Sequence, residues 1–357
     1  MVGFKELLVA PGFSIKQVME VIDRTAKGIA LVVDSERHLL GTVTDGDVRR
    51  GILRGIALDE RIENVMNRHP LTVTLGAADE EIRDLMLTHE IKQIPIINQD
   101  RQVLEIALWR DFIGTHAVRE NPVVILAGGL GKRLRPLTED TPKPLLKVGN
   151  RPILQSIIEH LAQQGFRQIY ISVCYKAEMI EEYFGDGSKL GVSIEYLMES
   201  KLSGTAGPLK LAQGRITTPF LVMNGDLLTK VNFEHLLDFH SKGAFEITVG
   251  IKNYSFQVPY GVLRVADDRI VALEEKPTQA FFVNAGIYAL NPGLLEMIPE
   301  ATYYDMTDLI GQLLKQGHAI GGFPLYEYWL DIGDPEAFQK ANTDHAKFFG
   351  EDYGTRG

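Results

Sequence analysis

The stretch that decides the fold reads Pro122-Val123-Val124-Ile125-Leu126-Ala127-Gly128-Gly129-Leu130-Gly131-Lys132-Arg133-Leu134. Its first half is an apolar run after a proline, which predicts a buried strand over residues 123–127. The strand leads directly into three glycines, whose missing side chains let backbone amides approach a ligand. Lys132 and Arg133 add positive charge. We therefore expect this loop to hold a phosphate group.

Two better-known phosphate loops do not fit this stretch. A Walker A loop needs a glycine five residues before its Gly-Lys pair, and Leu126 occupies that position. A dinucleotide-binding loop is followed about 20 residues later by an acidic residue. This chain has Val148-Gly149-Asn150 there. The loop therefore belongs to another kind of phosphate site.

Strands alternate with helices from residue 122 onward. The apolar runs predict strands over residues 123–127, 168–174, 192–197 and 220–223, and helices over residues 153–164, 177–184, 208–213 and 233–241. Such alternation predicts an α/β fold, a Rossmann-like and mostly parallel sheet with helices on both faces. Ligands of such sheets bind beyond the carboxyl ends of the strands.

The N-terminal region contains an internal repeat with an offset of 64 residues. A predicted helix over residues 14–25, with a Ser14–Gln17 capping box, matches one over residues 78–89. Strands over residues 29–34 and 41–44 match strands over 93–98 and 105–108. Each copy is too small to bury its own core, so the two should pack together. We expect domains over residues 1–118, with repeats at about 12–60 and 66–116, and over residues 122–357.

This repeat resembles a tandem pair of CBS domains, most specifically at Gly41-Thr42-Val43-Thr44-Asp45-Gly46-Asp47-Val48-Arg49. The resemblance implies an adenine-nucleotide site, for AMP or ATP, with Thr44 beside the cleft and Asp47 on the ribose hydroxyls. The alternative is that Asp47 only caps its helix. The second copy keeps Asp111 but has Leu108 in place of the threonine.

The second domain resembles the sugar-1-phosphate nucleotidyltransferases over residues 122 to about 345. The resemblance rests on the stretch Gly128 to Thr138, which includes Arg133, and on motifs in family order: Thr141-Pro142-Lys143-Pro144-Leu145, Gly204-Thr205-Ala206-Gly207, Val222-Met223-Asn224-Gly225-Asp226, Glu274-Glu275-Lys276-Pro277, Asn284-Ala285-Gly286-Ile287-Tyr288 and Trp329-Leu330-Asp331-Ile332-Gly333. It implies that a sugar 1-phosphate attacks the α-phosphorus of a nucleoside triphosphate with Mg²⁺ bound. Two anions must then be brought together and their charge spread, mostly by positioning and electrostatics.

The same resemblance assigns roles to individual residues. Arg133 would hold the departing pyrophosphate and Lys143 the phosphate at the reacting centre, while Asp226 and Asp331 would hold the metal. Asp331 has an alternative as a helix cap, although Asp334 is better placed for capping. The nucleotide-binding candidates are Leu126, Gly128, Gly129, Gly131, Glu199, Gly204 and Thr205. The candidates for the sugar phosphate are Gly261, Glu274, Lys276 and Asn284.

Glu199 bears on the choice of base. Relatives that use uridine or thymidine triphosphates often carry glutamine there, because an amide both donates and accepts. A carboxylate only accepts, so it suits the adjacent N1–H and amine donors of guanine. Glu199 therefore favours GTP, and the alternative is that its side chain faces water.

The sugar is left open among several candidates. A CBS pair ahead of this catalytic domain resembles the glucosamine-1-phosphate guanylyltransferases of bacterial legionaminic acid synthesis, which favours glucosamine 1-phosphate. A mannose-1-phosphate guanylyltransferase or a uridylyl- or thymidylyltransferase are the alternatives. A different class of function is an adenine-nucleotide sensor with an inactive transferase domain, against which the intact charged motifs argue.

The bulk properties set limits on partners. The net charge is -10 over 357 residues, which disfavours binding to nucleic acid. No apolar run reaches the roughly 18 residues of a membrane span, and no secretory signal is visible, so we expect a cytoplasmic protein that does not enter a membrane. The single cysteine excludes an intrachain disulfide. Analogy favours a homo-oligomer.

Overall fold

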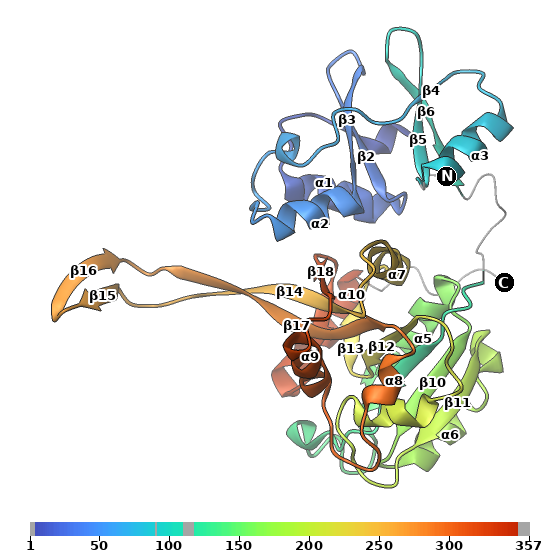
Figure 1. The fold of residues 1–357 in the computed structure, drawn as a ribbon, viewed down its shortest axis with the longest axis vertical. Helices are drawn as coiled ribbons and strands as arrows, with labels where there is room; N and C mark the ends of the chain where they lie inside the picture. The colour runs from blue at the N-terminus through green and yellow to red at the C-terminus, as the bar shows by residue number, and fades with distance from the viewer. Residues whose placement is uncertain (1–3, 90, 110–117, 349–357) are drawn as a thin grey trace. The chain divides into compact units, whose positions relative to one another are not determined.

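The computed structural model describes residues 4–89, 91–109 and 118–348 (Figure 1). The chain divides into two compact units, Met1–Ala117 and Val118–Gly357, which are described separately here. In the part of the chain that the structure describes, no helix is both long and apolar enough to cross a membrane.

The first unit contains the two repeats as two small sheets. The sheets have the strand orders β1-β2-β3 and β4-β5-β6. The elements are η1 (Phe4–Leu7), β1 (Leu8–Val9), α1 (Ile15–Thr25), β2 (Ile29–Val33), β3 (Leu39–Thr44), α2 (Asp45–Leu53), η2 (Ile62–Asn64), β4 (Val73–Thr74), α3 (Asp79–Thr88), β5 (Gln93–Ile97) and β6 (Val103–Leu108). Asp111, the second copy's candidate, lies outside the described residues.

The two repeats share a core, as their small size predicts. Ile97 and Val103 of the second repeat pack in one cluster with Leu31 and Leu39 of the first. The amide of Gln93 also donates to the Lys27 carbonyl, 3.2 Å away. The predicted capping box of α1 is present, because Ser14 and Gln17 exchange both hydrogen bonds.

The second unit is built on a seven-stranded sheet with the order β11-β10-β7-β12-β17-β14-β18. Its strands and the short hairpin strands are β7 (Val123–Leu126), β8 (Lys147–Val148), β9 (Arg151–Pro152), β10 (Gln168–Val173), β11 (Ser193–Met198), β12 (Phe220–Asn224), β13 (Leu227–Thr229), β14 (Ile247–Gln257), β15 (Val262–Ala266), β16 (Arg269–Glu274), β17 (Thr278–Leu290), β18 (Ile320–Leu325) and β19 (Trp329–Asp331). Its helices are η3 (Lys132–Leu134), η4 (Lys143–Leu145), α5 (Ile153–Gln163), α6 (Ala177–Phe184), η5 (Ser188–Leu190), η6 (Gly207–Ala212), α7 (Phe233–Lys242), α8 (Leu294–Met297), α9 (Met306–Lys315) and α10 (Pro335–Phe348).

The sheet is parallel-rich and α/β, as the alternation predicts. The pairs β11–β10, β10–β7, β7–β12 and β14–β18 are parallel. Only β17 runs against its neighbours β12 and β14. The predicted helix over residues 208–213 is instead the 3-10 helix η6, which begins with Gly207-Pro208.

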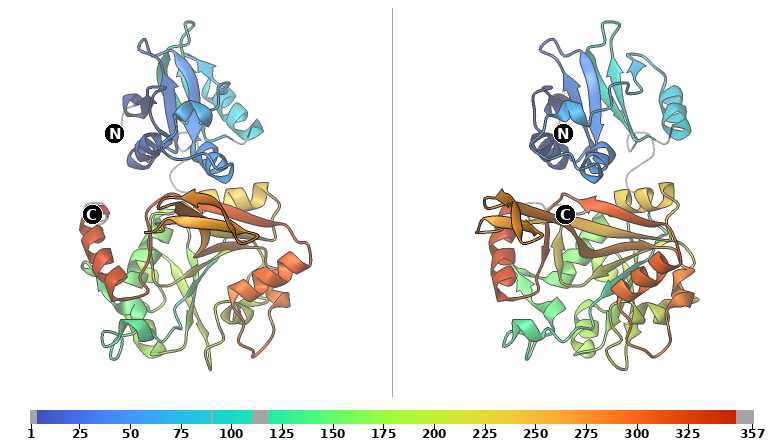
Figure 2. Two further views of the ribbon diagram at one scale, coloured as in Figure 1. Left: turned by 90° about the vertical axis from the view of Figure 1, so that its left-hand side faces the viewer. Right: turned by 60° about the vertical axis from the view of Figure 1, so that its left-hand side comes forward.

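Helices cover both faces of this sheet (Figure 2). Successive residues of β7 point to opposite sides, so Val123 and Ile125 pack in the core that contains α5, α6 and α7. Val124 packs in the second core, with α8 and α9. Because both faces are buried, the central strands read as continuous apolar runs, which is why the sequence revealed them.

Beyond the sheet, β14 and β17 continue as a two-stranded ribbon that ends in the β15–β16 hairpin (Figure 1). We call residues 252–283 the arm. Along β15 every residue is exposed, including Val265 and Leu263. The arm therefore carries apolar side chains outside both cores.

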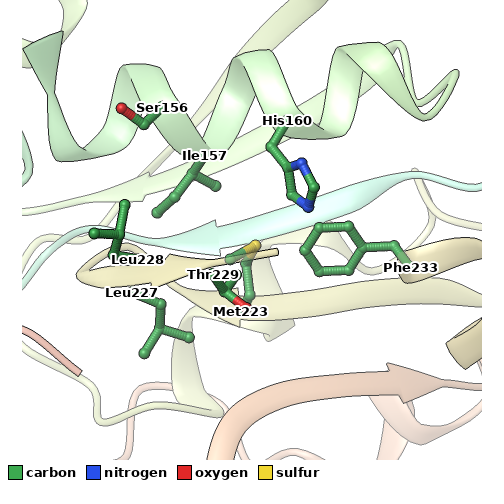
Figure 3. Close-up of a pocket in the computed structure, with 8 residues that line it drawn as sticks. All are labelled: Ser156, Ile157, His160, Met223, Leu227, Leu228, Thr229 and Phe233. Carbon is green, nitrogen blue, oxygen red and sulfur yellow. The ribbon is translucent and has the colours of Figure 1, made fainter. Parts of the chain in front are cut away.

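A small cavity of about 10 Å³ lies between α5 and the strands β12 and β13 (Figure 3). It is lined by Ser156, Ile157, His160, Met223, Leu227, Leu228, Thr229 and Phe233. Pockets that hold small molecules have volumes of roughly 300–1,000 Å³, so this cavity is a packing feature.

His160 lines this cavity, and burial of its ring lowers the pKa of its imidazole to about 4. The unfolded chain takes up a proton near pH 6.5 that the folded chain takes up only near pH 4, so the free energy of unfolding falls as pH falls through this window. We expect a loss of about 2 kcal/mol from this group between pH 7 and pH 5. Urea unfolding at both pH values measures it, and His160→Gln should reduce the pH dependence by that amount. An identical pH dependence in the variant would contradict the prediction.

Candidate active site

The candidate site lies where β7, β10 and β12 end, at the carboxyl edge of the parallel strands. Leu126 and Asn224 are register partners at the ends of β7 and β12. The Gly225 amide donates to the Leu126 carbonyl at 2.9 Å, and a Cβ on Gly225 would lie only 2.8 Å from that oxygen. A glycine is therefore required here, and it places Asp226 directly beside the glycine loop.

Three charged residues from distant parts of the chain meet at this edge. The Lys143 ammonium lies 2.5 Å from Oδ2 of Asp226. Asp331 is the last residue of β19, which pairs with β13 so that Leu227 lies opposite Asp331. The next residue, Ile332, donates its amide to the Asp226 carbonyl at 3.0 Å. The structure thus brings Lys143, Asp226 and Asp331 together across more than half the chain's length.

The surroundings of this cluster shift the pKa of one of its two carboxyl groups. Burial, and then the negative charge of Asp226, raises the pKa of Asp331, while Lys143 and Arg133 act in the opposite direction. Oδ1 of Asp226 is buried, and no hydrogen-bond partner for it occurs among the described residues. A buried, unpaired carboxylate oxygen beside a second carboxylate fits a hard divalent cation. Among the described residues, no group of three or more His, Cys, Asp or Glu side chains is arranged so that it could hold a metal ion.

The glycine loop is closed by a threonine. Gly131 has a φ of +60°, and the Thr138 hydroxyl donates to the Gly131 carbonyl at 2.9 Å. A Cβ on Gly131 would lie 2.9 Å from the Thr138 methyl group and 3.3 Å from the Lys143 Cβ. Gly129 has open space around it. Its absent side chain leaves room at the loop for a ligand.

Arg133 reaches the cluster from the loop. Its guanidinium acts on the Asp331 carboxyl and passes close to Gly333, where a Cβ would lie 3.2 Å from one of its nitrogens. Asp331 does not act as the helix cap in this arrangement, because the amide of Ala337 is capped by Asp334 at 2.8 Å.

Glu199 follows β11 and does not simply face water. Its Oε1 accepts the hydroxyl of Ser172 at 2.6 Å, and its Oε2 accepts the hydroxyl and amide of Ser203 at 2.6 and 3.1 Å. A Cβ on Gly128 would lie 2.6 Å from Oε1, so the carboxylate rests against the glycine loop.

The Gly204–Thr205 turn is held by a residue that the motifs did not indicate. Asp305 accepts hydrogen bonds from the amide and the hydroxyl of Thr205 at 2.9 and 3.1 Å. The Thr205 hydroxyl oxygen in turn accepts from the Met306 amide at 2.8 Å, at the start of α9. Gly204 has a φ of +87° and packs against the Tyr304 carbonyl. Only the acidic residue before a predicted helix could have suggested Asp305.

The four sugar-phosphate candidates are not brought together. Asn284 lies near the centre, because it accepts from the Gly286 amide at 3.0 Å and Gly286 abuts the side chain of Asn224. Gly261, Glu274 and Lys276 lie instead on the arm (Figure 1). From Thr278, where β17 begins two residues after Lys276, to Asn284 the strand spans about 20 Å at about 3.3 Å per residue. Sequence order could not reveal this, because it depends on how far β14 and β17 stay paired beyond the sheet.

In the first unit, Thr44 and Asp47 bond to each other. Thr44 is the N-cap of α2, its amide and hydroxyl donate to Oδ2 of Asp47 at 2.8 and 2.7 Å, and Arg50 pairs with Oδ1 at 2.5 Å. The capping alternative thus describes the contacts of Asp47 in this structure. An adenine-nucleotide role remains a prediction.

We expect Asp47→Ala to destabilise the first unit by about 1 kcal/mol, because it removes the capping box at α2. The midpoint of the corresponding transition in calorimetry of the full chain measures this effect. Asp59→Ala, which removes an exposed carboxylate from a turn, is the matched control. Equal midpoints for the two variants would contradict the prediction.

Fold and site together define an α/β protein in which a glycine loop, a lysine and two carboxylates meet at the carboxyl edge of a parallel-rich sheet. Residues 122–347 match the family model described as nucleotidyl transferase, and residues 5–54 and 62–115 match the CBS domain model. The chain belongs to the nucleotidyl transferase family and carries a CBS pair at its N-terminal side.

Named relatives are similar over about three fifths of the chain. A mannose-1-phosphate guanyltransferase of Yarrowia lipolytica is 37% identical over 223 residues, which cover 60% of this chain and 61% of that protein. A mannose-1-phosphate guanylyltransferase of Mycobacterium tuberculosis is 33% identical over 240 residues, covering 65% and 66%. The chain thus spans less than two thirds of the length of these curated relatives.

Solved structures are also similar to about two thirds of this chain. HddC from Yersinia pseudotuberculosis, complexed with GMP-PN, has a TM-score of 0.51 and 28% identity, over 63% of this chain and 99% of that one. A Bacillus anthracis protein described as a glucose-1-phosphate thymidylyltransferase has a TM-score of 0.54 and 25% identity, over 66% and 97%.

Proposed function

We propose that this protein transfers a guanylyl group from GTP to a sugar 1-phosphate and releases pyrophosphate. The observation that carries the proposal is the cluster of Lys143, Asp226 and Asp331 beside the glycine loop, 2.5 Å separating the lysine from Asp226. A cation next to paired carboxylates at a phosphate loop suits transfer between two anions, which needs charge neutralisation more than covalent chemistry.

In the proposed reaction, a phosphate oxygen of the sugar attacks the α-phosphorus of GTP. The bond from that phosphorus to the bridging oxygen breaks, and pyrophosphate leaves with the electron pair. A Mg²⁺ ion, when bound by Asp226 and Asp331, supplies positive charge to the triphosphate. Lys143 orients the phosphate at the reacting centre, and Arg133 binds the departing pyrophosphate through its planar guanidinium.

Two observations support guanine as the base. Glu199, an acceptor only, lies against Gly128 in the glycine loop. Two relatives cited above are guanylyl- or guanyltransferases by name, and one structural neighbour was solved with GMP-PN. The thymidylyltransferase neighbour keeps a pyrimidine nucleotide as the alternative.

For the sugar, the first candidate is mannose 1-phosphate. Glucosamine 1-phosphate was the expectation from the order of the two domains, but the names of the relatives favour the mannose alternative. Glucosamine 1-phosphate is the second candidate. Adenine-nucleotide binding at the CBS pair, assembly into a homo-oligomer, and the sugar-phosphate roles of Gly261, Glu274 and Lys276 stay predictions beside this proposal.

The test is a pyrophosphate-release assay with Mg²⁺. It crosses GTP, ATP, UTP, dTTP and CTP with mannose, glucosamine, glucose and N-acetylglucosamine 1-phosphates. We expect release in the GTP row, strongest with mannose 1-phosphate. Release in the dTTP or UTP row alone would retain the transferase and discard the guanine assignment. No release in any row, with AMP or ATP absent or present, would contradict the proposal and favour a sensor.

A further inference from the structure

Three segments of the second unit converge on one carboxylate, that of Glu199. Ser172 reaches it from β10, Ser203 from the loop before Gly204, and Gly128 from the glycine loop. The backbone reinforces the arrangement, because the Glu199 amide donates to the Val173 carbonyl and the Ala127 amide to the Ser172 carbonyl, both at 2.9 Å. A surface glutamate would not be held this closely.

The two serines hold it in different ways. Ser172 is completely buried, and its hydroxyl donates to Oε1 at 2.6 Å. If that bond were given up, a buried hydroxyl would be left without its partner, which is costly. Ser203 bonds to Oε2 twice, through its hydroxyl and its amide. Its hydroxyl can therefore rotate away while the amide keeps the loop in place.

The number of acceptor positions on the Glu199 carboxylate limits how many donors a nucleotide base can add. A carboxylate has about four positions for hydrogen bonds. Ser172 fills one and Ser203 fills two. One position is left, and release of the Ser203 hydroxyl makes a second available. Two is the number of adjacent donors, N1–H and the exocyclic amine, that guanine presents.

We propose that Ser172 is a positioning residue for base recognition, which fixes the Glu199 carboxylate against Gly128, and that the Ser203 hydroxyl occupies an acceptor position that a guanine donor takes over. This inference rests on the guanine assignment of the proposed function. It adds that base selectivity depends on a buried hydroxyl that does not touch the nucleotide.

The experiment measures dissociation constants of GTP and ITP by titration calorimetry of the full chain, with Mg²⁺ and without sugar phosphate. ITP lacks the exocyclic amine and is otherwise the same ligand. Wild type should bind GTP at least about tenfold more tightly than ITP, as one hydrogen bond to a charged group provides. Ser172→Ala should raise the dissociation constant of GTP about tenfold and that of ITP by a clearly smaller factor, because ITP presents only the N1–H donor to Glu199.

Three comparisons complete the test. Ser203→Ala should keep the preference for GTP at or above that of wild type, because the amide still anchors Oε2. Ser193→Ala removes an exposed serine at the start of β11, away from Glu199, and controls for serine removal in the same sheet. In a double-mutant cycle, Ser172→Ala should no longer alter the GTP to ITP ratio once Glu199→Gln is present. Thermal unfolding checks that each variant folds.

The outcomes separate this inference from the proposed function. A wild-type preference for GTP that Ser172→Ala leaves intact overturns the inference, and so does an equal loss for both nucleotides. Absence of any wild-type preference overturns the inference together with the guanine assignment. A selective loss in Ser172→Ala supports the inference even if pyrophosphate is never released, in which case only the transferase activity is lost.

Discussion

Lys143→Ala is expected to lower kcat by about 10²–10³-fold, the usual effect of removing one preorganised charge from a reacting centre. Lys143 has only 11% of its side chain exposed, between Pro142 and Pro144, and it lies 2.5 Å from Asp226. Its backbone is restricted by the prolines, so little entropy is lost when it contacts a phosphate. Steady-state pyrophosphate release at saturating substrates measures the effect.

Lys147→Ala is the matched control for Lys143→Ala. Lys147 lies four residues further along the chain, and its side chain is exposed on β8. It should keep kcat within about twofold of wild type, since surface charges have small effects. If Lys143→Ala retained full turnover while its thermal unfolding matched wild type, Lys143 would have no part in the mechanism.

Asp226→Asn is expected to lower kcat at least 10³-fold and to abolish the dependence of activity on Mg²⁺ concentration. The amide keeps the size of the carboxyl but removes the charge beside Asp331, and it offers the buried Oδ1 position as a neutral oxygen or an NH₂ group. Paramagnetic Mn²⁺ binding measures the metal site independently of turnover, and it should be lost. Asp268→Asn, in the exposed β15–β16 turn, is the control.

Because burial and Asp226 raise the pKa of Asp331, this carboxylate becomes charged at a higher pH than an ordinary aspartate. Mn²⁺ affinity should therefore rise with pH above the usual aspartate range.

Asp226→Asn with unchanged Mn²⁺ binding and turnover would show that the pair does not hold a metal.

Much of the second unit could be predicted from its sequence. The central strands β7, β10, β11 and β12 are buried on both faces and bounded by turns, so their apolar runs are unambiguous. The glycine loop and Asp226 follow such strands directly. Their meeting at one edge follows from parallel strand direction alone.

Other features depend on tertiary pairing and have no local signal. The β13–β19 pair sets Leu227 opposite Asp331, although the two are about a hundred residues apart. The bond from Ser172 to Glu199 joins β10 to the loop after β11, two segments that are 27 residues apart. The course of the arm likewise depends on how far β14 and β17 remain paired beyond the sheet, which alternation does not specify.

The central claim is guanylyl transfer at the α-phosphorus, and labelled GTP tests it most directly. Purified protein is incubated with Mg²⁺, mannose 1-phosphate and GTP that carries ³²P at either the α or the γ position. The account predicts that α-label appears in a nucleotide sugar and γ-label in pyrophosphate, in equal amounts and only when sugar phosphate is present. Release of γ-label as inorganic phosphate, or of pyrophosphate without a labelled nucleotide sugar, would contradict it.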